Sequence, residues 1–167
     1  KSIELSLLLS IPASVGLIIA SDEIVSALFG YGSFSLESAQ MTASALKFFG
    51  FGVPAFALVK VLSNFFFARN DTKSPFYISS FIVSINILIS LTLFNEYGFI
   101  IIPIATSIST WTGVLIYLFV LNKKNSLLIK NNLITNIIKT ILITIFMTFI
   151  LVFALDFYAN YLDYTYK

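Results

Sequence analysis

The sequence contains no cysteine and no histidine, and only 11% of its 167 residues are charged. The missing cysteine and histidine exclude disulfides, thiolate or imidazole metal ligands, and catalysis by a Ser-His or Cys-His pair within this chain. The scarcity of charge excludes an ordinary soluble surface, because a soluble domain of this size needs more polar side chains to cover its core. The net charge of +2 is too small to indicate a nucleic-acid-binding protein.

Long apolar segments make up most of what is present. Hydrophobic residues account for 58% of the chain, and five segments have the length and apolar character of a helix that crosses a bilayer. We therefore predict an all-α integral membrane protein, a polytopic transmembrane helix bundle. The five predicted spans are residues 5–29, 44–68, 76–94, 99–121 and 137–157.

The connections between the spans include no low-complexity tract and no flexible Gly/Ser linker, which indicates one domain or part of one. Residues 122–136 are predicted to form a cytoplasmic amphipathic linker on the membrane surface. The apolar positions that favour this prediction run from the linker into the start of the next span, and they are Leu127, Leu128, Ile134, Ile137 and Ile138. Residues 137–167 are predicted to form an additional transmembrane helix and a periplasmic tail.

The start of the chain indicates a piece of a larger polypeptide. The sequence begins at Lys1, and its first apolar run is too long, with the wrong flanks, for a cleaved signal peptide. We expect that this piece does not fold stably by itself, because half of its packing partners would be missing.

The basic residues predict an orientation in the membrane. Alternating the five spans places seven basic residues on one side and two on the other, and most acidic residues collect with the two. Because basic loop residues are retained in the cytoplasm, the first side is predicted to be cytoplasmic. The seven are Lys1, Arg69, Lys73, Lys123, Lys124, Lys130 and Lys139, and the two are Lys47 and Lys167.

Lys60 lies among otherwise uncharged residues of the second predicted span. Ionisable residues inside a span are costly and often functional. One interpretation is a cation that lines a polar cavity and meets an anionic substrate group such as a phosphate. The other is a snorkelling lysine, because the nine residues to Arg69 correspond to roughly 13 Å of helix, which the long side chain shortens. The residues alone favour neither.

The turn after this span reads RNDTKSP and is short enough to be a hairpin between two spans. Its Arg69, Asp71 and Lys73 could contact a lipid headgroup. We favour the structural alternative, in which Asp71 caps the next helix and the two cations hold the turn at the cytoplasmic face.

A polar stripe follows the third and fourth spans. At about 100° per residue, Ser79, Asn86 and Ser90 share one face of the third span. The matching face of the fourth span carries Ile102, Thr106, Ser109, Thr110, Gly113 and Tyr117. We favour close packing with interhelical hydrogen bonds. The alternative is a cation site of amide, hydroxyl and backbone oxygens. The sequence holds no Walker A loop and no H-E-x-x-H motif, so we predict that the chain is not an enzyme.

Four stretches together resemble the C-terminal half of the MurJ/MviN family, the lipid II flippases of the multidrug/oligosaccharidyl-lipid/polysaccharide (MOP) exporter superfamily. They are IPASVGLIIASDEIVSALFGYGSF, PAFALVKVLSNFFFARNDTKSP, SINILIS and IATSISTW, and they occur in order between Ile11 and Trp111. The resemblance implies a fourteen-helix fold. Residues 1–121 would belong to its C-terminal six-helix lobe, residues 137–157 would be an added helix, and the N-terminal lobe would be missing.

The same resemblance implies a function, a location and partners. The function is export of lipid II, the undecaprenyl-diphosphate-linked peptidoglycan precursor, from the cytoplasmic to the periplasmic leaflet by alternating access, for cell wall biogenesis. The location is the bacterial inner membrane. The implied partners are lipid II, the bilayer and the missing N-terminal lobe of the same polypeptide, with no nucleic acid.

The resemblance also implies site residues. The family has a cationic central cavity, which makes Lys60 a substrate-binding candidate, and a lipid groove flanked by its last two helices. Some members hold a sodium site, which here would fall on Asn86, Ser90, the Ile102 carbonyl and Thr106. Na⁺ as a coupling ion is therefore the one cofactor to consider. At the Ser90 position a sodium site would need a carboxylate, and this chain has a serine hydroxyl instead.

Two other function classes stay open on the sequence. A related MOP-superfamily exporter, either a polysaccharide-unit flippase or a cation-coupled drug antiporter, would share the fold, and Lys60 argues for an anionic substrate. A non-transporting membrane scaffold would leave Lys60 snorkelling and the polar stripe as packing.

Overall fold

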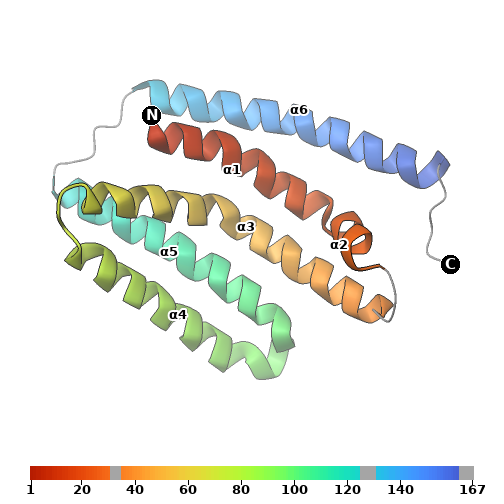
Figure 1. Ribbon diagram of the computed structural model, residues 1–167, viewed down its shortest axis with the longest axis horizontal. Helices are drawn as coiled ribbons and strands as arrows, with labels where there is room; N and C mark the ends of the chain where they lie inside the picture. The colour runs from red at the N-terminus through yellow and green to blue at the C-terminus, as the bar shows by residue number, and fades with distance from the viewer. Residues whose placement is uncertain (31–34, 125–130, 162–167) are drawn as a thin grey trace.

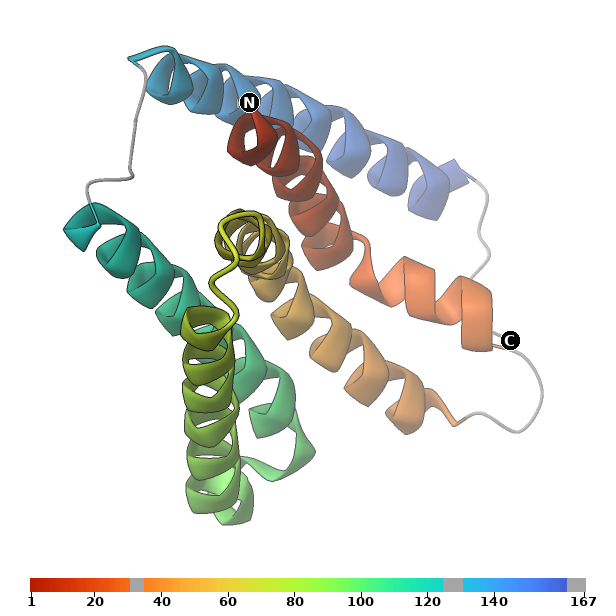
Figure 2. The ribbon, with the colours of Figure 1, turned by 60° about the vertical axis from the view of Figure 1, so that its left-hand side comes forward.

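A computed structural model describes residues 1–30, 35–124 and 131–161, and all its regular elements there are helical. They are α1 (Ser2–Ile19), α2 (Ser21–Phe29), α3 (Leu36–Phe67), α4 (Lys73–Tyr97), the single turn η1 (Gly98–Ile100), α5 (Ile101–Lys123) and α6 (Asn131–Tyr161). Across the bundle the long helices lie in the order α6, α1, α3, α5, α4 (Figures 1 and 2). The predicted all-α bundle is confirmed.

Four continuous stretches of the described residues are long and apolar enough to cross a membrane. The third of them, Lys73–Lys123, is 51 residues long and folds back on itself at Gly98, so it holds the two helices α4 and α5. Together the four stretches contain five helices of sufficient length for the five predicted crossings. The four stretches are Ser2–Ile19, Leu36–Phe67, Lys73–Lys123 and Thr135–Tyr158.

The first predicted span, residues 5–29, is two helices rather than one. The backbone leaves the helical conformation at Ala20, and α2 begins with two acidic residues, Asp22 and Glu23, in its first turn. Acidic side chains stabilise the positive N-terminal end of a helix, which favours a new start here over continuation of α1. α1 alone, at 18 residues or roughly 27 Å, is long enough to span the hydrocarbon.

The second span also begins earlier than its apolar run suggests. α3 starts at Leu36, where the Ser35 hydroxyl accepts a hydrogen bond from the Ser38 backbone N–H at 3.1 Å and caps the helix. With 32 residues, α3 is roughly 48 Å long and exceeds the thickness of the hydrocarbon core. α6 begins at Asn131, so the described end of the predicted linker continues into that helix. Leu127 and Leu128 lie outside the described residues.

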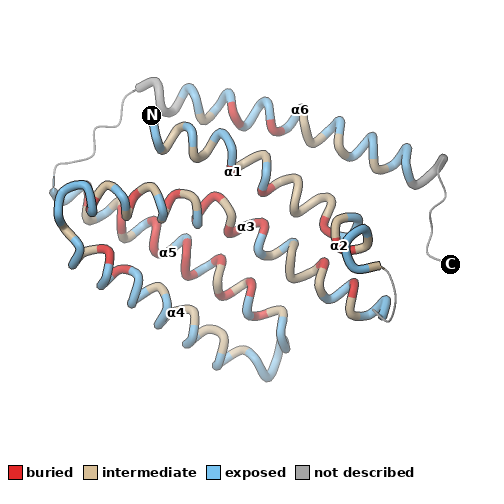
Figure 3. The backbone as a smooth tube through the Cα atoms, viewed as in Figure 1, coloured by how far each residue is buried: buried red, intermediate tan, exposed pale blue. Residues whose placement is uncertain are grey.

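The core lies between α3, α4 and α5. Buried residues gather on α3 and α5, while α4 and α6 expose most of their residues (Figure 3). Gly113 of α5 allows α4 to approach closely, because a Cβ at this position would lie only 2.7 Å from Ile82 Cγ1. The buried residues of this cluster are Ala55, Leu58, Leu62, Phe66, Ile78, Val114, Tyr117 and Leu121, and a smaller cluster of Val25, Ala39 and Ala43 joins α2 to α3.

Candidate functional site

Lys60 lies on α3, on the side that faces away from the core. Its side chain is exposed, as are those of Phe56 and Asn64 one turn before and after it. The Ser63 hydroxyl donates to the Lys60 backbone carbonyl at 3.0 Å, and within the described residues the ammonium group has no ion pair. An ammonium that projects from an apolar helix without a local carboxylate can bind an anionic group.

The turn between α3 and α4 is held by Asp71. Its carboxylate accepts hydrogen bonds from the Ser74 backbone N–H at 3.0 Å and the Ser74 hydroxyl at 2.7 Å, so it caps the start of α4. Its second partner is Lys124 at the end of α5, whose Nζ lies 2.7 Å from Asp71 Oδ2. The hydrogen bond from Lys124, followed by those from Ser74, holds the Asp71 pKa well below its usual range.

Two cations at this turn, Arg69 and Lys124, lie over aromatic rings. The Arg69 guanidinium lies 4.1 Å from the centroid of the Phe65 ring, and Lys124 Nζ lies 5.3 Å from that of Phe66. Lys73 is exposed at the first position of α4. The turn thus connects the ends of α3, α4 and α5. Lys124, the partner of Asp71, was not predicted from the sequence.

The four residues of the candidate cation site form one chain of hydrogen bonds between α4 and α5. Asn86 Nδ2 donates to Thr106 Oγ1 at 2.8 Å, and Thr106 Oγ1 donates to the Ile102 carbonyl at 2.7 Å. Ser90 Oγ donates to Asn86 Oδ1 at 3.5 Å, the longest link of the chain. Because the Thr106 proton is committed to Ile102, the Asn86 amide must present its NH₂ group to Thr106.

This arrangement sets what the chain of hydrogen bonds can do chemically. In this arrangement Asn86, Ser90 and Thr106 each have a hydrogen-bond partner, which is the packing function expected between membrane helices. To hold a cation, the Asn86 amide would have to rotate so that its oxygen joins Thr106 and Ile102. No Asp or Glu lies in α4 between Lys73 and Asn95, and none lies in α5 between Ile101 and Lys123, so these segments offer the site no carboxylate ligand.

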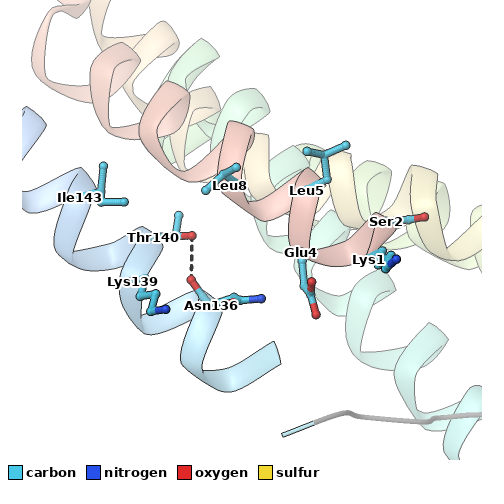
Figure 4. A pocket seen from close by; sticks show the side chains of 9 residues that line it. All are labelled: Lys1, Ser2, Glu4, Leu5, Leu8, Asn136, Lys139, Thr140 and Ile143. Atoms are coloured by element: carbon cyan, nitrogen blue, oxygen red, sulfur yellow. Dashed lines mark hydrogen bonds between the residues drawn. The ribbon is translucent and has the colours of Figure 1, made fainter. Parts of the chain in front are cut away.

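A groove of about 550 Å³ lies between the first two turns of α1 and residues Asn136–Ile143 of α6. Figure 4 shows Glu4 and Asn136 pointing into it from opposite walls. Its apolar part comes from Leu5, Leu8 and Ile143, and its polar lining comes from Lys1, Ser2, Glu4, Asn136, Lys139 and Thr140. A surface that combines apolar side chains with two ammonium groups has the chemistry to accept an amphiphile with an anionic headgroup.

The middle of α3 holds three contacts that sequence reasoning missed. Side chains of the neighbouring helices donate to backbone carbonyls of α3 over one turn. Ser14 Oγ of α1 lies 2.7 Å from the Gly50 carbonyl oxygen, Ser107 Oγ of α5 lies 2.8 Å from that of Phe48, and Trp111 Nε1 of α5 lies 3.0 Å from that of Phe51. The signal that could have found the Ser14 contact is Pro54, which has no N–H to donate to Gly50; no local signal marks the other two.

Comparison with known proteins places these features in a family. The model of the family described as "Lipid II flippase MurJ" matches residues 1–166. A probable lipid II flippase MurJ of Rhizobium tropici is 38% identical over 72% of this chain and 22% of its own length. That of Rickettsia prowazekii is 39% identical over 66% of this chain and 22% of its own length.

A solved structure has the same fold. The structure titled "Lipid II flippase MurJ, inward closed conformation" superposes with a TM-score of 0.82 at 25% sequence identity, and the match covers 99% of this chain and 32% of that one. This chain therefore spans about a fifth to a third of the length of the proteins that it matches. Since the family model covers nearly the whole sequence, the chain belongs to the lipid II flippase MurJ family.

Proposed function

We propose that this chain is part of a lipid II flippase of the bacterial inner membrane. The whole protein would move the undecaprenyl-diphosphate-linked precursor from the cytoplasmic to the periplasmic leaflet by alternating access, for cell wall biogenesis. The observation that carries the proposal is the family match over residues 1–166. The remaining helices, including the N-terminal lobe, would complete the transport path.

Lys60 is the residue of this chain that we propose to meet the substrate. The diphosphate of lipid II is strongly anionic, and a lysine ammonium binds phosphate as a compact point charge. Lys60 is exposed on a membrane-spanning helix and faces away from the α3–α4–α5 core, so its ammonium is free to face a cavity formed with the missing lobe. The groove between α1 and α6, whose lining combines apolar side chains with two lysines and one glutamate, supports the same substrate class, a lipid with a charged head.

The test is transport by the full-length protein with Lys60 replaced. We expect Lys60→Ala to lower lipid II translocation about tenfold or more, because a hydrogen bond to a charged group is lost. Lys60→Arg keeps the charge and should retain most activity. Lys47→Ala, an exposed lysine near the other end of α3, is the matched control and should be unaffected. Normal translocation and growth complementation by Lys60→Ala would assign Lys60 to snorkelling.

We also propose that Na⁺ could couple transport through Asn86, Ser90, the Ile102 carbonyl and Thr106. The support is that these four groups lie in one hydrogen-bonded chain between two membrane helices. Asn86→Ala should then abolish any stimulation of translocation by sodium, whereas Ser84→Ala, on the exposed side of α4, should leave it intact. Translocation that is equally fast in potassium and in sodium would leave these residues with packing alone.

A further inference from the structure

We propose that the segment Gly50–Pro54 is a hinge in α3 and that Ser14, Ser107 and Trp111 are positioning residues that set its bend. The inference builds on the proposed function, because the part of α3 beyond the hinge carries Lys60. Figure 1 shows α3 changing direction near its middle. Proline is one of the few common causes of a sharp bend in a helix, and here Gly50, Gly52 and Pro54 fall within five residues.

Proline creates the need for outside donors. Pro54 lies inside α3 and has no N–H, so the Gly50 carbonyl lacks the donor that the helix would otherwise supply. Inside a bilayer no water replaces that donor, and an unsatisfied carbonyl is costly. The Ser14 hydroxyl of α1 replaces it at 2.7 Å, in a buried contact.

Glycine lets the neighbouring helices come close enough to supply these donors. A Cβ at Gly50 would lie 2.7 Å from Ile18 Cγ1 and 3.3 Å from the Ser14 carbonyl, so α1 could not approach. A Cβ at Gly52 would lie 2.8 Å from Ser107 Oγ, which is the group that donates to Phe48. The two glycines and the two serines therefore form one unit in which α3 is held from both sides.

The three donors differ in how easily they can be withdrawn. Ser14 and Ser107 are 6% and 7% exposed, so breaking either bond would leave buried polar groups unpaired. Trp111 is 41% exposed, so its indole N–H can leave the Phe51 carbonyl without becoming an unpaired buried donor. When the bend changes, the hydrogen bonds of the two buried serines stay in place and the hydrogen bond of Trp111 breaks.

The hinge acts on transport by moving Lys60. Lys60 follows Pro54 by six residues, or roughly 9 Å of helix, so a change in bend of about 20° displaces its backbone by roughly 3 Å. Asn64, ten residues after Pro54, would move by roughly 5 Å for the same change. A shift of this size is enough to make or break a contact between an ammonium and a phosphate.

The test measures the bend directly in the full-length protein. Spin labels are placed at Leu9 of α1 and Asn64 of α3, both exposed, in a cysteine-free background, and their distance distribution is recorded with and without lipid II. We expect two populations about 5 Å apart whose ratio changes with lipid II. Trp111→Phe, which removes the indole donor and keeps a smaller aromatic ring, should shift the ratio by about two- to tenfold. Pro54→Ala should collapse the distribution to one population.

Matched controls separate the outcomes. Tyr97→Phe also removes the polar group of an exposed aromatic residue, far from the hinge, and should leave the ratio unchanged. A single distance that neither lipid II nor Trp111→Phe nor Pro54→Ala changes would overturn the hinge. If the distances respond to Trp111→Phe while Lys60→Ala transports normally, the hinge stands and the proposed role of Lys60 is wrong.

Discussion

Removing the hydroxyl of Ser14 tests how a membrane helix tolerates its proline. Ser14 Oγ donates to the Gly50 carbonyl at 2.7 Å, and Pro54 leaves that carbonyl without a donor from its own helix. In Ser14→Ala the carbonyl stays buried with no donor. The cost of an unsatisfied buried acceptor is about 1–3 kcal/mol, and we expect the free energy of unfolding to fall by that amount.

The same reasoning predicts a rescue. Pro54→Ala restores the N–H that the Gly50 carbonyl lacks, so Ser14→Ala should cost less than about 0.5 kcal/mol in that background. The double-mutant cycle should therefore give a coupling energy of about 1–2 kcal/mol between two residues of different helices. Ser84→Ala is the control, because its hydroxyl donates at 2.9 Å to the Ser80 carbonyl on the exposed side of α4.

The assay is equilibrium unfolding of the full-length protein and its variants by denaturant in mild detergent micelles. Each variant is compared at equal protein and detergent concentration, and the slope of each transition is checked before free energies are compared. If Ser14→Ala costs the same with and without Pro54, the hydroxyl does not replace the missing helix donor. The account of the α3 bend would then be wrong, whatever the absolute stability of the single variants.

Two further predictions concern the packing of α5 and the turn before α4. Gly113→Ala should destabilise the protein by about 1 kcal/mol or more, because the new Cβ must displace a side chain of α4. Gly16→Ala is the control and should be neutral or stabilising, because nothing lies within 4 Å of its Cβ position. The two variants are compared by thermal unfolding. Asp71 has a lowered pKa when folded, so its stabilisation is present above its unfolded value of 3.8 and is lost only as pH falls toward the folded value. Asp71→Asn should therefore lower the unfolding temperature equally at pH 5 and pH 8, and a difference that varies across this range would contradict the assignment.

The features that the sequence predicted correctly depend on local spacing. Five crossings follow from the length of each apolar run, and the prediction joined α1 and α2 into one span because apolar residues resume soon after Ala20. Asn86, Ser90, Ile102 and Thr106 meet because each pair is four residues apart on its helix and a single turn joins the two helices. Asp71 was expected to cap α4 for the same local reason.

The contacts that the sequence did not predict join residues far apart in the chain. Asp71 and Lys124 are 53 residues apart, and Ser14 and Gly50 are 36 residues apart. In a soluble helix the apolar stripe shows which face meets the core. In these helices the residues that face lipid are as apolar as those that face the core, so periodicity does not show which helices are neighbours.

The few polar residues of the spans indicate which helices are neighbours, which the periodicity of apolar residues does not show. A proline inside an apolar span frees a carbonyl, and the bilayer offers no water to satisfy it, so a neighbouring helix has to supply a donor. In this chain the donor is Ser14, and two small residues, Gly50 and Gly52, clear the space in which α1 and α5 approach. A G-x-G-x-P sequence in one span therefore predicts a serine, threonine or tryptophan on an adjacent span, which is a long-range contact that can be sought from the sequence alone.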